Sequence, residues 1–231
     1  MILSIFHIIT AYYIGNIFSY KKFLLPSILI GSIIPDMDIV LAPFLLIFFT
    51  FKDIEILFLK TFSHNIFFAL FIYLIINIIN ELKKNNLQYS ASGITLGILI
   101  HLFLDVLVSL DPINIFWPLP IKSIDIWHNT IIPNNFTQLI MLLEFILFGW
   151  YAWLLIKKHL NNPSSNSWIV TYLNQWKKFE LYFFLILLLV LITYPANFYS
   201  LYITFYIITI IISLAATHLS IDSLDLSMSN N

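Results

Sequence analysis

The sequence predicts an all-α fold, a polytopic transmembrane helical bundle of about seven spans with a broken second helix. Of its 231 residues, 60% are hydrophobic and only 10% are charged, whereas soluble domains carry about 25% charged residues. The mean hydropathy is +0.92. Apolar stretches near the length of a bilayer crossing, about 20 residues, recur along the chain. These observations place the protein in the cell membrane as a multi-pass protein.

Seven apolar segments follow one another along the chain, separated by polar connectors. The first lacks the basic start and the small-residue cleavage site of a signal peptide, so we interpret it as a retained span. The predicted spans are residues 2–18, 23–51, 56–80, 93–110, 136–156, 179–194 and 198–217. We group them as a metal-site transmembrane core with an outer loop, 1–135, C-terminal transmembrane helices, 136–219, and a polar tail, 220–231.

Two carboxylates interrupt the second segment. Asp36 and Asp38 lie near its middle, directly after Pro35, and proline removes a backbone donor and disfavours helix at the residue before it. An Asp near the centre of a membrane helix costs about 2.5–3.5 kcal/mol. Non-helical backbone at that depth occurs only where it is buried in protein or lines a wet cavity. The stretch therefore predicts a helix break and a polar site inside the membrane domain.

The lysines give an orientation, because cytoplasmic loops carry an excess of positive charge. With the N-terminus outside and the C-terminus inside, the inner loops hold eight Lys residues and the outer side holds three. A re-entrant second segment would change this topology, and that alternative stays open. The net charge of −1 and the lack of a basic patch argue against a nucleic-acid partner. Membrane lipid is the expected partner.

Histidines and aspartates from four segments fall at matching depth in this topology. His101 and Asp105 are four residues apart, so they share one helix face, and His64 is expected about two turns into the third span. Imidazole nitrogen and carboxylate oxygen are ligands that Zn²⁺ accepts, and the chain has no Cys. We predict a divalent metal, Zn²⁺, in the outer half of the bilayer, with ligands drawn from His7, Asp36, Asp38, His64, His101 and Asp105.

Taken singly, these residues also fit ordinary structural roles. His7 fits a packing hydrogen bond between helices, His101 and Asp105 fit a hydrogen bond within one helix, and the Asp36–Asp38 stretch fits a solvated turn. Their joint occurrence at one depth favours the shared site. Glu144 is a further carboxylate in the fifth predicted span, and it either joins the site or lines a proton path.

The motifs have a characteristic order along the first 130 residues: His7, then Gly31-Ser-Ile-Ile-Pro-Asp-Met-Asp38, Ser63-His64, His101-Leu-Phe-Leu-Asp105 and Phe116-Trp-Pro-Leu119. This order resembles the membrane-bound metal-dependent hydrolase family. That family is also described as LexA-binding, inner-membrane-associated and hydrolase-like, and it is distantly similar to zinc-dependent phospholipase C. The resemblance implies that the metal-site residues are His7, Asp36, Asp38, His64, His101 and Asp105.

The chain departs from the family's pattern at three places. The family has a His after the second Asp, where this chain has Ile39, and a His-Arg pair where this chain has Leu59 and Lys60. The family's Thr-His-Ser element is Ser63-His64-Asn65 here. Fewer ligands therefore remain for a two-metal site.

Three functional hypotheses follow. The first is an integral membrane metal-dependent hydrolase acting on a lipid-like ester or phosphoester, in which Asp36 or Asp38 activates water and the other residues hold the metal. The second is an ion- or proton-coupled transporter, because intramembrane ionisable residues and broken helices mark transport pathways. The third is a non-catalytic membrane protein with a degenerate site, as Ile39 and Leu59 suggest. The sequence assigns neither the substrate nor the oligomeric state.

Overall fold

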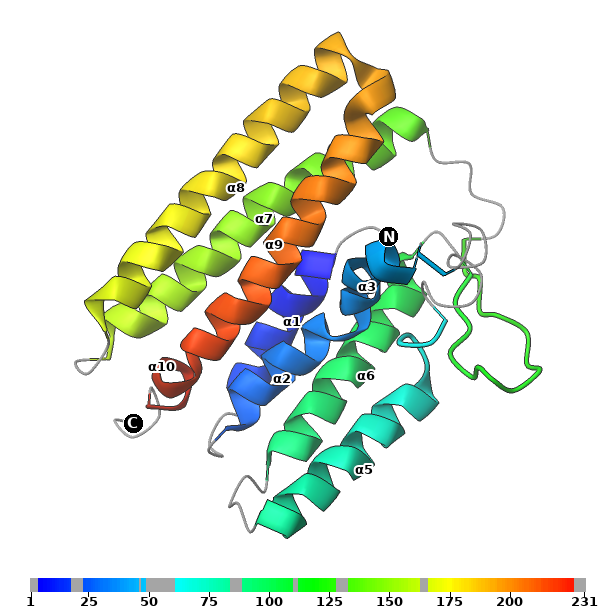
Figure 1. The fold of residues 1–231 in the computed structure, drawn as a ribbon, viewed down its shortest axis with the longest axis vertical. Coiled ribbons are helices and arrows are strands. Elements are labelled where there is room, and N and C mark those ends of the chain that lie inside the picture. The colour runs from blue at the N-terminus through cyan, green and yellow to red at the C-terminus, as the bar shows by residue number, and fades with distance from the viewer. Residues whose placement is uncertain are drawn as a thin grey trace. The chain divides into compact units, whose positions relative to one another are not determined.

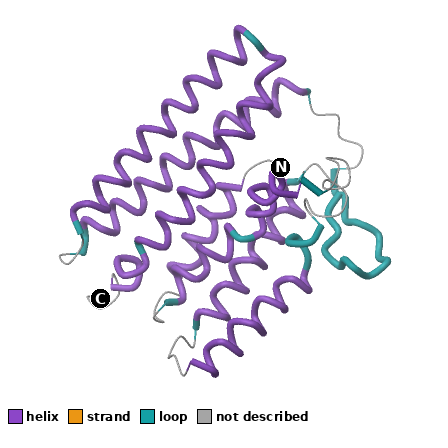
Figure 2. The backbone as a smooth tube through the Cα atoms, in the orientation of Figure 1, coloured by secondary structure: helices purple, strands orange, loops and turns teal. Residues whose placement is uncertain are grey.

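The structure is a computed structural model, and it describes residues 4–17, 23–45, 47–48, 61–83, 89–109, 112–127, 133–162 and 166–226. Within these ranges the regular structure is helical, with one isolated antiparallel bridge between Ile113 and Ile124 (Figure 1, Figure 2). The chain forms two compact units, Thr10–Thr130, and Ile2–Ile9 together with Ile131–Asn231. The first helix, α1 (Ser4–Ile17), begins in the second unit and ends in the first.

The first unit contains the break that the sequence predicts at Pro35. Its helical elements are α2 (Leu24–Ile33), the 3-10 turn η1 (Pro35–Met37), α3 (Asp38–Leu45), α5 (Ile66–Lys83) and α6 (Ser90–Val108). Pro35 begins η1, where its missing N–H group is tolerated. The helices on either side of the break are bent by 41° relative to each other. The broken second helix is therefore confirmed.

Helices α2 and α6 lie side by side and approach backbone to backbone (Figure 1). A Cβ atom added to Gly31 would lie 2.1 Å from the carbonyl oxygen of Ile94, and one added to Gly97 would lie 2.1 Å from that of Ile28. Membrane helices come this close where small residues repeat every four positions, as Gly93 and Gly97 do on α6. Glycine at these positions therefore sets the spacing between the two helices.

The prediction of a third span over residues 56–80 is wrong about where the helix begins. Helix α5 starts only at Ile66, and residues 61–65 form a turn that carries His64. The side chain of Asn65 stabilises this start, because its Oδ1 atom accepts a hydrogen bond from the N–H of Phe68 at 2.8 Å. His64 therefore precedes the helix instead of lying two turns inside a span. Residues 51–60 lie outside the described part of the chain.

The second unit contains three long helices, a short turn and a short final helix among its described residues. They are α7 (Asn134–Leu160), α8 (Ser167–Thr193), the turn η2 (Pro195–Asn197), α9 (Phe198–Leu219) and α10 (Ile221–Leu226). Helix α8 is continuous from Ser167. It therefore begins well before residue 179, where the sequence predicts the start of the sixth span. Ile169, Leu173 and Trp176 repeat at helical spacing and are buried, so this first half packs as a helix despite its polar residues. Helix α10 occupies part of the predicted polar tail.

Four helices of the described residues are long and apolar enough to cross a membrane, α5, α6, α7 and α9 with its preceding turn, and the bent pair of α2 and α3 would make a fifth. Helix α1 has 14 residues and spans about 21 Å, which is shorter than the hydrocarbon core. A multi-pass helical membrane fold is therefore established, and the number of seven spans stays a prediction.

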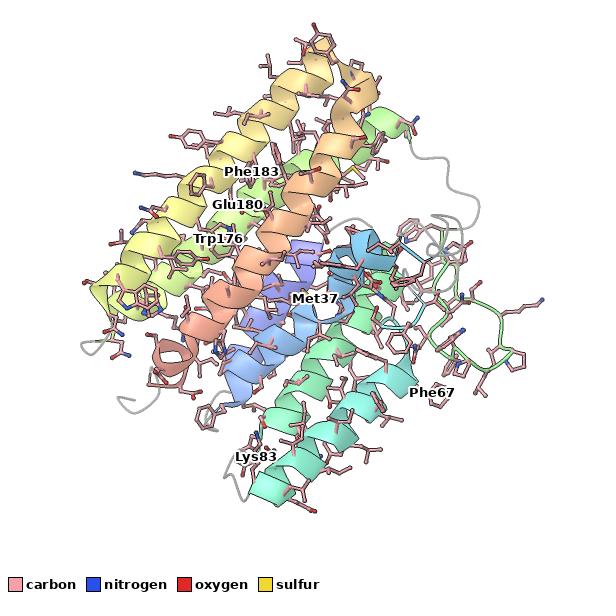
Figure 3. All side chains as sticks on the ribbon, viewed as in Figure 1. Met37, Phe67, Lys83, Trp176, Glu180 and Phe183 are labelled. Atoms are coloured by element: carbon pink, nitrogen blue, oxygen red, sulfur yellow. The ribbon has the colours of Figure 1, made fainter. Side chains whose placement is uncertain are left out.

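Two carboxylates are fully buried in the second unit, and both have hydrogen-bond donors. Glu180 on α8 accepts from the indole of Trp176 at 2.5 Å and from the hydroxyl of Thr209 at 3.0 Å, and Figure 3 labels the first two residues. Glu144 on α7 accepts from the backbone N–H of Ser4 at 2.9 Å and from the hydroxyl of Tyr202. The bond between Trp176 and Glu180 lies within α8, whereas the bonds from Thr209, Ser4 and Tyr202 join different helices.

Candidate metal centre

Five of the six residues that the sequence selects lie close together within the first unit. The turn η1 and the start of α3 supply two carboxylates, the turn before α5 supplies an imidazole, and α6 supplies one of each. All five residues are at most 9% exposed. We call them the His/Asp cluster: Asp36, Asp38, His64, His101 and Asp105.

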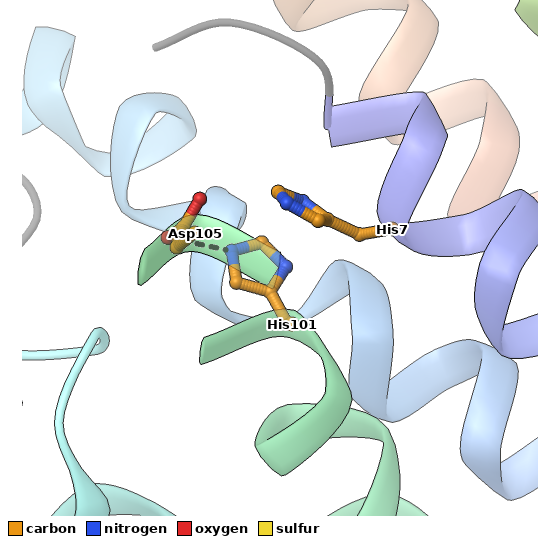
Figure 4. Close-up of side chains that lie close together, drawn as sticks. All are labelled: His7, His101 and Asp105. Carbon is orange, nitrogen blue, oxygen red and sulfur yellow. Dashed lines mark ion pairs between the residues drawn. The ribbon is translucent and has the colours of Figure 1, made fainter. Parts of the chain in front are cut away.

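The ring of His101 is held by the backbone of α2. Its Nδ1 atom lies 2.8 Å from the carbonyl oxygen of Ser32. A carbonyl only accepts hydrogen bonds, so Nδ1 carries the proton, and in the neutral ring Nε2 presents a lone pair. That Nε2 atom lies 3.4 Å from Oδ2 of Asp105, the ion pair drawn in Figure 4, and 3.8 Å from Oδ1 of Asp36. The lone pair therefore faces the carboxylates.

The ring of His64 is also held through its Nδ1 atom, in this case by a side-chain hydroxyl. The hydroxyl of Ser63 donates to Oδ2 of Asp38 at 3.1 Å, and its oxygen lies 2.9 Å from Nδ1 of His64. Because the only hydroxyl proton goes to Asp38, the oxygen accepts the Nδ1 proton of His64. The Nε2 atom of His64 then faces Asp36 at 3.7 Å and Asp105 at 3.5 Å.

Both imidazoles thus direct Nε2 towards the same two carboxylate oxygens, Oδ1 of Asp36 and Oδ2 of Asp105. One ligand atom each from Asp36, His64 and His101 lie within 4.8 Å of one another. Imidazole nitrogen with carboxylate oxygen is a donor set that suits Zn²⁺. The donor chemistry therefore fits a divalent metal, and the hydrogen bonds at both Nδ1 atoms are the outer contacts that orient such ligands.

The electrostatics of the cluster favour a positive charge. It contains three buried carboxylates and two histidines, and like charges placed together in a buried site disfavour one another. The same three carboxylates would attract a metal cation.

The other residues that the sequence analysis discussed are not members of this cluster, and two of them lie outside the described residues. His7 is buried on the part of α1 that belongs to the second unit, so its role as a ligand stays a prediction. Glu144 also belongs to the second unit. Ile39 is buried on α3, whereas Leu59 and Lys60 lie outside the described residues.

The sequence analysis did not identify the residues that orient the imidazoles of the cluster or set the distance between α2 and α6. The hydroxyl of Ser63 orients His64, and its position directly before that His was a signal that could have been used. The small residues Ser27 and Gly31 on α2, and Gly93 and Gly97 on α6, are four apart. That spacing is readable as a close helix contact. The carbonyl of Ser32 as a partner for His101 left no signal in the sequence.

Removing the hydroxyl of Ser63 is expected to weaken metal binding without removing a ligand. In Ser63→Ala, His64 and Asp38 lose their shared contact, and loss of such an outer contact typically lowers metal affinity about 10- to 100-fold. Competition with a fluorescent chelator measures the affinity. Ser63→Thr keeps the hydroxyl and is expected to bind within a few-fold of the unmodified protein. Equal affinity in Ser63→Ala and Ser63→Thr would contradict this role.

Comparison with known proteins gives one family. The family described as "YdjM inner membrane protein" matches residues 2–175, a range that includes the whole His/Asp cluster. No curated protein and no solved structure matches the chain. The family and the long apolar helices together establish a multi-pass inner-membrane protein. The family's description names a location and no reaction.

Proposed function

We propose that this chain, which belongs to the YdjM inner membrane protein family, is a metal-dependent hydrolase of the inner membrane that cleaves a lipid-like ester or phosphoester. One observation carries the proposal: two histidine Nε2 atoms from separate segments face the same two buried carboxylate oxygens. Buried carboxylates are unfavourable in an apolar environment unless a cation compensates their negative charge. Figure 4 shows the part of this arrangement on α6.

The contacts support a division of roles. Asp36, His64, His101 and Asp105 would hold Zn²⁺, because their facing atoms converge. When bound, the metal polarises an ester or phosphoryl oxygen and lowers the pKa of a coordinated water. Asp38 lies on the other side of His64, 3.4 Å from Nδ1, and it accepts the hydroxyl of Ser63. We assign it to orienting His64.

The proposed arrangement in the membrane follows the lysine distribution. With the N-terminus outside and the C-terminus inside, the cluster lies in the outer half of the bilayer, where a membrane lipid can reach it. His7 is proposed as an additional ligand.

Metal content tests the proposal directly. Protein purified in detergent without chelator is expected to carry about one Zn²⁺ per chain by elemental analysis, because one donor set of two histidines and two carboxylates holds one ion. The double variant His101→Ala, Asp105→Ala is expected to carry none. A matched control is His218→Ala, Asp222→Ala, a His and an Asp at the same spacing that are exposed.

Hydrolysis of bacterial phospholipids by the metal-loaded protein is the second measurement. Turnover that is lost in Asp105→Asn and on chelation is expected. Metal bound without any turnover would favour the non-catalytic hypothesis. If neither the unmodified protein nor the His101→Ala, Asp105→Ala variant carries metal, the hydrolase proposal is overturned.

A transporter is the second candidate, and the buried carboxylates Glu144 and Glu180 on long helices of the second unit favour it. Sealed proteoliposomes would then show proton or cation flux that Glu144→Gln abolishes. Absence of flux from metal-loaded vesicles would exclude it.

A further inference from the structure

A pocket of about 220 Å³ in the first unit opens at the turn that carries His64. We call it the aromatic pocket, and it is lined by Phe62, Asn65, Phe67, Phe68, Phe71 and Trp117. Two of these residues, Phe62 and Asn65, flank Ser63 and His64 in the same turn. Consecutive Cα atoms are about 3.8 Å apart, so both lie at most about 7.6 Å from the Cα atom of His64.

The walls of the pocket are fixed by contacts between the turn and the outer loop. The N–H of Ile66 donates to the carbonyl of Ile115 at 2.9 Å, which ties the loop to the start of α5. The ring of Phe62 packs edge to face on Trp117 and on Phe68, with centroids 6.3 and 5.6 Å apart. The pocket is therefore a formed feature of the fold that packing holds in place.

The lining of the pocket is mostly aromatic. Besides the indole of Trp117, its polar side chain is Asn65, whose Nδ2 atom donates to the carbonyls of Thr61 at 2.8 Å and Phe62 at 2.7 Å. The Oδ1 atom of Asn65 accepts from the N–H of Phe68. With the amide committed to the turn, the other five lining residues present aromatic rings. Such a surface recognises hydrocarbon by apolar contact.

The pocket also opens on the side of α5 that faces lipid. Only 6% of the candidate span of α5 is buried, and the lining residues Phe67 and Phe71 are 40% and 54% exposed. Figure 3 shows Phe67 at the start of this helix. A hydrocarbon chain can therefore enter from the bilayer without crossing water.

We propose that the aromatic pocket binds the acyl chain of a membrane lipid, and that it directs the ester end of that lipid towards the His/Asp cluster. This inference rests on the proposed hydrolase function and narrows its substrate to an acyl-chain lipid. The occupant is a hydrocarbon chain because the pocket is apolar, lies open to the bilayer and is lined by two residues of the turn that carries His64.

Photolabelling tests the pocket separately from the reaction. The Asp105→Asn protein is reconstituted in vesicles of phosphatidylethanolamine and phosphatidylglycerol that contain phosphatidylglycerol with a diazirine near the ester end of its acyl chain. Labelled peptides are then mapped by mass spectrometry. We expect labels at the pocket residues to exceed those on Leu74, Ile78 and Leu82, exposed residues of the same helix, by about tenfold, the ratio for a moderate preference in binding.

Variants that fill the pocket sharpen the test. Phe71→Trp is expected to lower pocket labelling about tenfold by occupying part of the volume, and Phe67→Trp is a second filling variant. Phe103→Trp is the matched control, because Phe103 is 63% exposed on α6 and does not line the pocket. Circular dichroism confirms that each variant is folded.

The outcomes separate this inference from the proposed function. Uniform labelling along α5, or labelling that neither filling variant reduces, would overturn the pocket while metal binding and hydrolysis stand. Pocket labelling, together with no metal in the unmodified protein, would support the lipid site and remove the hydrolase proposal.

Discussion

Gly97→Ala is expected to destabilise the protein strongly, because its added methyl group has no room between two helices. The added Cβ would lie 2.1 Å from the carbonyl oxygen of Ile28 and 2.7 Å from the backbone N of Ser32. Both neighbours are backbone atoms of α2, so no side chain can rotate away, and the helices must separate. We expect a loss of about 3 kcal/mol or more in the free energy of unfolding, the upper end for overpacking.

Gly149→Ala is the matched control for this substitution. A Cβ at Gly149 would meet its nearest neighbours, Glu180 and Lys177, at 3.8 and 3.9 Å, which is ordinary contact. Its effect is expected to be neutral or stabilising, by up to about 1 kcal/mol, because alanine favours helix. Unfolding in detergent followed by circular dichroism measures both. Equal stability of the two variants would contradict the close contact of α2 and α6.

The same substitution is expected to disturb the metal centre. Separating α2 from α6 moves the carbonyl of Ser32 away from Nδ1 of His101, a contact of 2.8 Å. The ring of His101 then loses its orientation. Because such an outer contact typically contributes about 10- to 100-fold to metal affinity, Gly97→Ala protein that remains folded is expected to bind metal at least about tenfold more weakly.

Asp36→Asn is expected to abolish metal binding while leaving the fold intact. Asp36 is one of the two carboxylates that face both imidazoles, 3.7 Å from His64 and 3.8 Å from His101. The amide keeps the shape but loses the charge, and the affinity is expected to fall by more than about 100-fold, beyond the effect of an outer contact. Chelator competition measures this loss. Asp222→Asn, a substitution at an exposed position, is the control.

Stability distinguishes a metal ligand from a purely structural carboxylate at Asp36. Metal at 100 times its dissociation constant should stabilise the unmodified protein by about 2.7 kcal/mol, and Asp36→Asn should show no such increase. The metal-free variant should be at least as stable as the metal-free unmodified protein, because one of three adjacent buried carboxylates has been neutralised. A variant that is destabilised without metal yet binds it normally would show that Asp36 serves the fold alone.

Some features of the site were readable because they depend on neighbours in the sequence. The spacing of His101 and Asp105 places them on one face of any helix, and they do lie on one face of α6, 3.4 Å apart. Pro35 ends α2 because it lacks a backbone donor, so the break was also readable. Hydropathy likewise acts through composition, and the multi-pass membrane class followed from it.

Other features depended on residues distant in the sequence. The start of α5 at Ile66 was missed because apolar composition alone does not separate a helix from the turn before it. The extent of α8 was missed because contacts with other helices, between Trp176 and Tyr151 and between Glu180 and Thr209, outweigh the polar residues around them.

The sequence by itself determined that this is a helical membrane protein with carboxylates and imidazoles in apolar segments, since hydropathy and local backbone chemistry act along the chain. Only the tertiary structure decided which nitrogen of each imidazole faces the carboxylates. That choice depends on an oxygen atom at each Nδ1, from Ser32 for one ring and Ser63 for the other. The carbonyl oxygen of Ser32 reaches His101 because Gly31 and Gly97 let two helices meet without side chains between them, and such contacts form only when the helices pack.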